Sequence, residues 1–169
     1  MEKMDFDLII VGSGPSGLAA GLYAARSNLK VAIFERALIG GQMALTLEVD
    51  NYPGFADKDA YKLIQIMQKQ TESFGCKLIN DNILYIDFDK KIVKTSKKVF
   101  LAKTLILSMG TNPKELGIDG EKKFRGMGVS YCATCDGAFF ADKILAVIGG
   151  GNSALEEGIF LTKFAKNAP

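Results

Sequence analysis

The sequence GSGPSG at residues 12–17 restricts the fold of this 169-residue chain more than any other feature. It lies between an apolar run at residues 7–11, which predicts a buried strand, and residues 16–27, which are rich in Ala and Leu and predict a helix. Residues 30–35 predict a second strand. A G-x-G-x-x-G loop in such a unit is typical of dinucleotide binding, because its glycines permit a tight turn, close approach of a pyrophosphate and close packing of the helix.

An acidic residue follows this loop at the distance typical of a ribose-binding carboxylate. Glu35 ends the second predicted strand, 18 residues after Gly17 (35 − 17), where the dinucleotide fingerprint has an acid after roughly 20. The alternative is a Gly-rich turn without a ligand, and the spacing alone does not separate FAD from NAD. Ser13 and Ser16 have no base to activate them, so we predict hydrogen bonding or helix capping for their hydroxyls.

A second loop of the same kind lies near the end of the chain. Residues 149–154 (GGGNSA) follow a predicted strand at residues 143–148 and open a helix predicted from about residue 153 to 166. Ala154 fits the G-x-G-x-x-A variant. Two such loops suggest two cofactors, a flavin and a nicotinamide that reduces it. A glycine turn without a ligand is a stronger alternative here, since a ribose-binding residue would lie beyond Pro169.

The middle of the chain predicts a helix and then several strands. Residues 59–74 carry apolar side chains at helical spacing and precede Gly75, a residue typical of helix ends. Five short strand-like runs follow in residues 76–107. Those between residues 83 and 102 are separated by charged turns, which predicts an antiparallel meander inserted into a parallel sheet.

Cys132 and Cys135 stand at C-x-x-C spacing, and Asp136 follows directly. Such a pair near a helix start can form a reversible disulfide. A zinc site would need two further Cys or His, whereas the chain has no His and only Cys76 besides, so we predict no metal site. Asp136 is a candidate proton donor in a chain without His, and a helix N-terminal charge is its alternative role. Cys76 stands alone in an apolar context, which predicts a buried strand residue without redox chemistry.

Composition excludes several classes of function. The 21 Lys and Arg against 19 Asp and Glu give a net charge of +2 without a basic stripe, which argues against a nucleic-acid partner. The absence of His excludes a Ser-His-Asp triad, a Cys-His pair and a His-ligated metal from this chain alone. The chain starts without a signal-peptide pattern and has no apolar run near the roughly 18 residues of a membrane span. We therefore expect a soluble cytoplasmic protein without a membrane partner.

The order of three motifs, GSGPSG, CATCDG and VIGGGNSA, resembles the low-molecular-weight, bacterial-type thioredoxin reductases, which are FAD- and NAD(P)-dependent pyridine nucleotide-disulfide oxidoreductases. Residues 40–42 (GGQ) and 48–54 (EVDNYPG) also resemble stretches that surround the flavin in that family. The glutathione-reductase class differs, with its Cys pair beside the first flavin motif and a catalytic His. Peroxiredoxin-reducing flavoproteins share the layout but usually carry C-P-H-C. Ser108-Met109-Gly110 departs from the family's usual Ala-Thr-Gly.

The resemblance implies a function and a set of site residues. Electrons would pass from NADPH to FAD, then to the Cys132–Cys135 disulfide and then to thioredoxin, with Asp136 exchanging a proton. The residues implied for FAD are Gly12, Ser13, Gly14, Pro15, Ser16, Gly17, Glu35, Arg36, Gly40, Gly41, Gln42, Asn51 and Gly110. Those implied for NADPH are Gly149, Gly151, Asn152, Ser153 and Ala154.

The resemblance also implies the domain organisation. We expect an α/β fold with a Rossmann-like FAD-binding domain at residues 1–110 that contains the meander, a linker at 111–128, and the start of a Rossmann-like NAD(P)-binding domain at 129–169. The resemblance covers about half of such an enzyme, which is a homodimer in its full-length form. Residues 1–169 alone are therefore expected to bind FAD weakly and not to catalyse thioredoxin reduction. A peroxiredoxin reductase component, a non-catalytic flavin-binding module and a protein that docks on a homologue are the alternatives.

Overall fold

The structure is a computed structural model that describes residues 5–166. Its contacts divide the chain into two compact units, Met1–Thr111 and Asn112–Pro169. Residues 112–128, where a linker is predicted, are grouped with the second unit. Each unit is described below by itself.

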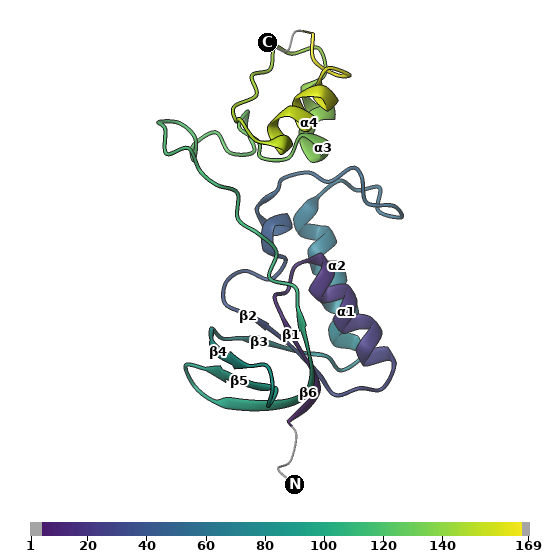
Figure 1. The fold of residues 1–169 in the computed structure, drawn as a ribbon. Coiled ribbons are helices and arrows are strands. Elements are labelled where there is room, and N and C mark those ends of the chain that lie inside the picture. The colour runs from purple at the N-terminus through teal and green to yellow at the C-terminus, as the bar shows by residue number, and fades with distance from the viewer. Residues whose placement is uncertain (1–4, 167–169) are drawn as a thin grey trace. The chain divides into compact units, whose positions relative to one another are not determined.

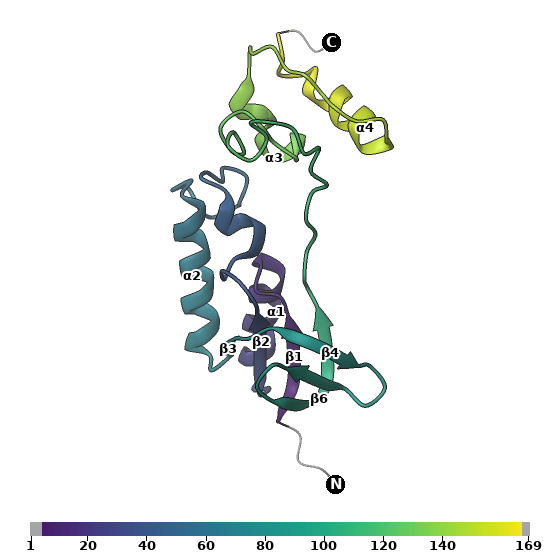
Figure 2. The same ribbon diagram turned by 90° about the vertical axis from the view of Figure 1, so that its left-hand side faces the viewer.

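The first unit is built on a sheet of six strands, β1 (Phe6–Val11), β2 (Val31–Glu35), β3 (Lys77–Asn80), β4 (Ile83–Asp87), β5 (Ile92–Thr95) and β6 (Val99–Leu107). Their order in the sheet is β3-β2-β1-β6-β5-β4 (Figure 1). Strand β6 runs parallel beside β1 in one half of its length (Figure 2) and pairs antiparallel with β5 in the other. It thereby joins the parallel part of the sheet to the meander.

Two helices cover one face of this sheet, α1 (Pro15–Arg26) and α2 (Ala60–Ser73) (Figure 1). Successive side chains of a strand point to opposite faces, so Leu8 and Ile10 pack toward the helices, while Ile9 packs with residues of β2, β5 and β6 on the other face. All three are buried. Burial of both faces explains why residues 8–11 of β1 are all apolar.

The predicted α/β fold with a Rossmann-like unit and an antiparallel meander is confirmed for the first unit. One detail differs from the sequence prediction of five strand-like runs. The last two runs, residues 98–102 and 104–108, form one strand, β6, because its first half pairs with β5 and its second half continues beside β1. Residues 41–45 form a 3₁₀ helix, η1 (Gly41–Leu45).

The second unit contains α3 (Ala133–Asp136), the 3₁₀ helix η2 (Gly137–Phe140) and α4 (Asn152–Leu161). The prediction of a strand at residues 143–148 is wrong, since the described part of the chain forms no strand there. An apolar run becomes a strand only where a neighbour pairs with it, and no strand of the second unit is described beside this run. None of the helices between residues 5 and 166 is long and apolar enough to cross a membrane.

Helix α4 ends at Leu161, earlier than the predicted residue 166. The Thr162 hydroxyl donates to the carbonyl of Ile159 at 2.7 Å. The next amides bond back by three residues, Lys163 to Phe160 and Phe164 to Leu161, which tightens the chain into a turn. A side chain that competes for helix carbonyls explains the early end.

Candidate functional site

Backbone packing requires the first and third glycines of the loop at residues 12–17. Gly12 has φ +99°, and a Cβ built on it would lie 2.4 Å from the carbonyl oxygen of Ser108. A Cβ on Gly17 would lie 2.0 Å from the carbonyl oxygen of Gly12. These distances are far below van der Waals contact, so a larger residue at either position would displace the loop from the sheet.

The second glycine faces open space. No heavy atom lies within 4 Å of a Cβ built on Gly14, which is the N-cap residue of α1. No side chain caps this helix, its first turn holds no acidic residue, and Pro15 has no N–H group. Uncapped amides at the N-terminus of a 12-residue helix, beside an opening that a side chain would fill, fit the phosphates of a dinucleotide. Helix capping was one of the two roles predicted for the Ser13 and Ser16 hydroxyls, and neither hydroxyl caps α1.

Glu35 is tied to the same loop. Its Oε2 accepts hydrogen bonds from the N–H of Ser13 at 3.0 Å and from the Ser13 hydroxyl at 2.9 Å, and Ser13 is fully buried. Its Oε1 accepts from the backbone N–H groups of Arg36 and Ala37. Burial raises the pKa of the Glu35 carboxyl, but these bonds outweigh burial and hold the pKa below its usual value. Glu35 is therefore an ionised acceptor beside the glycine loop at neutral pH.

The glycine pair at residues 40–41 also packs against the loop. The N–H of Gly40 donates to the carbonyl of Ser13 at 3.0 Å, and a Cβ on Gly41 would lie 3.4 Å from Cα of Gly14. The Gln42 side chain donates to the carbonyl of Thr111 at 3.2 Å. The structure thus brings residues 12–17, 35, 40 and 41 together. Arg36, Asn51 and Gly110 are exposed.

Ser108 is a residue of this site that the sequence analysis noted only as a departure from a family pattern. Its hydroxyl oxygen lies 3.0 and 2.9 Å from the carbonyl oxygens of Val11 and Gly12, which share its one hydrogen, and its N–H donates to the carbonyl of Val11. These bonds join the end of β6 to the point where β1 enters the loop. The position directly after a strand that pairs with β1 was the signal that could have identified it.

The second glycine loop has the same local design in the second unit. Gly149 has φ +154°, and a Cβ on it would lie 2.8 Å from Cβ of Ala154. A Cβ on Gly151 would meet nothing within 4 Å, and this residue is the N-cap of α4 without a side-chain cap. Asn152 and Ser153 form the exposed first turn of the helix. The loop therefore leaves an open, uncapped helix N-terminus, as the loop at residues 12–17 does.

Cys132 and Cys135 form a disulfide at the start of α3, with 5.3 Å between their Cα atoms. The Thr134 hydroxyl lies 3.4 Å from Sγ of Cys132 and is the donor, because a disulfide sulfur carries no hydrogen. The N–H of Ala133 donates to Oε2 of Glu157 on α4 at 3.0 Å. In the described residues no group of three or more side chains is arranged to hold a metal ion.

The segment before the disulfide is anchored by Glu121, which is only 4% exposed. Its carboxylate accepts from the N–H groups of Leu116 and Gly117 at 2.8 and 2.7 Å and from the Tyr131 hydroxyl at 2.7 Å. The Leu116 and Tyr131 bonds hold the pKa of Glu121 below its usual value. Because Tyr131 precedes Cys132, this anchor fixes the chain where it enters the disulfide.

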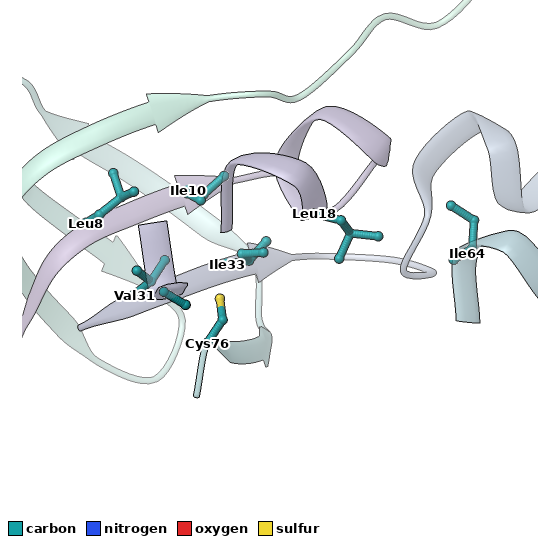
Figure 3. Packing of buried hydrophobic residues seen from close by; sticks show 8 residues of the cluster. Leu8, Ile10, Leu18, Val31, Ile33, Ile64 and Cys76 are labelled. Carbon is teal, nitrogen blue, oxygen red and sulfur yellow. The ribbon is translucent and has the colours of Figure 1, made fainter. Parts of the chain in front are cut away.

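Cys76 is the free cysteine among the described residues, and it lies in the core between the sheet and α1 and α2 (Figure 3). It is 4% exposed and directly precedes β3. Burial, followed by the nearby Glu72 charge, raises the pKa of its thiol to about 11. The thiolate is the reactive form of cysteine, so Cys76 is unreactive near neutral pH.

Thiol labelling is expected to separate Cys76 from the pair. With a pKa of about 11, only about one Cys76 thiol in a thousand is ionised at pH 8, and its burial also excludes reagent. After mild reduction of the folded protein, iodoacetamide at pH 8 should label Cys132 and Cys135 together, as located by peptide mass spectrometry, and leave Cys76 unlabelled until urea is added. Labelling of Cys76 in the folded protein would contradict this assignment.

A parallel sheet ending in a glycine loop, a second glycine loop and a C-x-x-C disulfide define the class of dinucleotide-fold disulfide oxidoreductases. The pyridine nucleotide-disulphide oxidoreductase family matches residues 6–169, and the chain belongs to this family.

Relatives within the family are thioredoxin reductases. The chain is 49% identical to the thioredoxin reductase of Peptoclostridium litorale, over 98% of this chain and 53% of that protein. It is 44% identical to the thioredoxin reductase of Bacillus subtilis, over 97% of this chain and 52% of that protein. The crystal structure of the Streptococcus pyogenes thioredoxin reductase matches with a TM-score of 0.91 and 46% identity, over 96% of this chain and 54% of that one. The chain thus spans about half the length of these relatives and matches the N-terminal half of a low-molecular-weight thioredoxin reductase.

Proposed function

We propose that this chain supplies the flavin-binding loop and the redox disulfide of a thioredoxin reductase, in which NADPH reduces FAD, FAD reduces the Cys132–Cys135 disulfide, and the dithiol reduces thioredoxin. The observation that carries the proposal is the disulfide at C-x-x-C spacing in a chain that also holds two open, uncapped glycine loops. The family membership and the names of the relatives support it.

The first glycine loop is the site that we propose for FAD. The α1 amides and the space above Gly14 would receive the pyrophosphate. Glu35 would accept hydrogen bonds from ribose hydroxyls. The Glu35 carboxylate accepts four hydrogen bonds, three from backbone N–H groups and one from the Ser13 hydroxyl. Because the hydroxyl is the one side-chain donor among these four, we propose that a ribose hydroxyl would replace the Ser13 hydroxyl bond. A small hollow lined by Ile33, Glu35, Ile39, Leu78, Ile79 and Asn80 adjoins this carboxylate.

The other residues proposed to bind FAD or NADPH rest on two kinds of support, contact with a glycine loop and resemblance to the family. Gly40, Gly41 and Gln42 would close the site, since the glycine pair packs on the loop. Arg36, Asn51 and Gly110 are proposed from the resemblance to the family. Gly149, Gly151, Asn152, Ser153 and Ala154 are proposed for the NADPH pyrophosphate, on the open N-terminus of α4.

When bound, reduced FAD supplies two electrons and one proton to the disulfide. The second proton of the change from disulfide to dithiol comes from an acid, and we assign this role to Asp136, which follows Cys135 in a chain without His. The C-A-T-C sequence favours thioredoxin over a peroxiredoxin-linked acceptor. The homodimer is proposed from the resemblance, whereas the cytoplasmic location stays a prediction from the sequence patterns.

The proposal is tested on the chain extended by the remaining half of the Peptoclostridium litorale relative, here called the extended protein. We expect it to carry one FAD, to lose flavin absorbance near 450 nm on addition of about two equivalents of NADPH, one for the disulfide and one for the flavin, and to regain it with oxidised thioredoxin. Residues 1–169 alone are expected to bind FAD weakly and not to oxidise NADPH continuously. An extended protein that folds and binds FAD but gives NADPH-dependent bleaching without thioredoxin-dependent recovery would contradict the assigned acceptor.

A further inference from the structure

The hydroxyl of Ser130 connects two residues of the redox site. Its Oγ accepts a hydrogen bond from the N–H of Cys132 at 3.0 Å and donates to Oδ2 of Asp136 at 2.5 Å. The direction of both bonds is determined by chemistry, because an amide can only donate and the hydroxyl has one hydrogen. The carbonyl of Cys132, at 3.3 Å, is the more distant acceptor for this hydrogen.

These contacts have a consequence for the two oxygens of Asp136. Oδ2 is occupied by the Ser130 hydroxyl, whereas no hydrogen bond to Oδ1 is recorded among residues 5–166. A proton carried by the carboxyl group would therefore reside on Oδ1. Asp136 is also held by its N–H, which donates to the carbonyl of Cys132 at 3.1 Å. The backbone of Asp136 is thus bonded to Cys132 directly, and its side chain is connected to Cys132 through the Ser130 hydroxyl.

We propose that Ser130 is a positioning residue for proton transfer in this site: it fixes the Asp136 carboxyl relative to the Cys pair and makes Oδ1 the oxygen that delivers the proton. The proposal rests on the proposed function, in which Asp136 is the acid. Proton transfer requires the acid to lie within hydrogen-bonding reach of the sulfur that accepts the proton. A carboxyl group without the Ser130 bond samples several rotamers and meets that geometry less often.

Reduction of the disulfide by dithiothreitol tests this step without any cofactor. A thiolate of dithiothreitol attacks one protein sulfur, the S–S bond breaks, and the released sulfur takes the proton from Asp136. The second dithiothreitol thiol then loses its proton, closes the ring and releases the other protein sulfur, which takes up that proton, so the products are a protein dithiol and the cyclic disulfide. The rate is followed over pH 6–9 by the appearance of labelled Cys132 and Cys135 in residues 1–169.

We expect Ser130→Ala to slow this reduction roughly tenfold near pH 7, a modest part of the about 10²–10⁴ that general acid catalysis contributes. Ser130→Thr keeps the hydroxyl and should restore most of the rate. In an Asp136→Asn background, Ser130→Ala should have no further effect, since Ser130 acts through Asp136. Ser96→Ala is the matched control, because the exposed Ser96 hydroxyl also donates to an aspartate, Asp81, at 2.9 Å and lies in the first unit.

Three outcomes would overturn the proposal. Ser130→Ala with the wild-type rate would remove the role of the hydroxyl. Losses in Ser130→Ala and Asp136→Asn that multiply in the double variant would show that Ser130 acts on the local fold and not through the acid. If Asp136→Asn itself reduces at the wild-type rate, the acid assigned in the proposed function is wrong. A slow Asp136→Asn with a normal Ser130→Ala contradicts the inference about Ser130 alone.

Discussion

Replacement of Gly17 by Ala is expected to destabilise the first unit by about 3 kcal/mol or more, the upper range for overpacking in a close-packed region. The new methyl group would lie 2.0 Å from the carbonyl oxygen of Gly12 and 2.8 Å from the Ser108 hydroxyl oxygen. Within a helix, Gly→Ala alone would stabilise by about 1 kcal/mol, so the clash with backbone outweighs the helix propensity. The urea midpoint of residues 1–169, followed by circular dichroism, measures the loss.

Two other glycines provide matched comparisons for Gly17→Ala. Gly158 lies inside α4, and its built Cβ has no neighbour closer than 3.9 Å, so Gly158→Ala should be neutral or slightly stabilising. Gly14 has φ −63° and an open Cβ position, so Gly14→Ala should fold as the unchanged protein does while binding FAD at least tenfold more weakly. If Gly14→Ala binds FAD normally, the space above Gly14 does not receive the pyrophosphate.

Replacement of Cys132 or Cys135 by Ser is expected to reduce thioredoxin reduction by the extended protein to the background rate. A single thiol cannot form the intramolecular disulfide that joins the pair, so two electrons cannot be stored and passed on. FAD content and bleaching by NADPH should remain, because the glycine loop lies outside the disulfide segment. A steady-state assay with thioredoxin, run beside a flavin spectrum of the same sample, separates the two effects.

Cys76→Ala is the matched cysteine control for these variants. Cys76 is buried among apolar residues of the core, so the truncation should cost about 1 kcal/mol of stability, a typical value for a point mutation, and leave turnover unchanged. Turnover that survives in Cys135→Ser would contradict the assignment of the redox pair.

The local signals of the first unit were sufficient to predict its fold. Residues 8–11 are apolar without alternation because both faces of β1 are covered, and the glycine loop marks the point where the strand turns into α1. The strand at residues 143–148 was predicted from the same kind of apolar run and does not form. A strand forms only when a neighbouring strand supplies hydrogen-bond partners, and the apolar pattern of one segment does not indicate whether such a neighbour is present.

The residues of the site were predictable only where a motif contains them. Gly12, Gly14, Gly17 and Glu35 have fixed spacing, so their proximity followed from the sequence. Ser108 and Ser130 act through hydrogen bonds to backbone and carboxylate atoms that are 96 and six residues away, respectively. Serine is common in loops for many reasons. The local sequence therefore does not distinguish a serine hydroxyl that bonds to a loop carbonyl or to a carboxylate from one that contacts only solvent.

The path of the electrons is the central claim, and trapping the thiols of the extended protein after reduction tests it most directly. The FAD-loaded protein is mixed anaerobically with one equivalent of NADPH, quenched with iodoacetamide, and digested for mass spectrometry. We predict that bleaching of the flavin near 450 nm is followed by labelling of both Cys132 and Cys135, in equal amounts, with Cys76 unlabelled. Bleached flavin with an intact Cys132–Cys135 disulfide, or label at Cys76, would contradict the account.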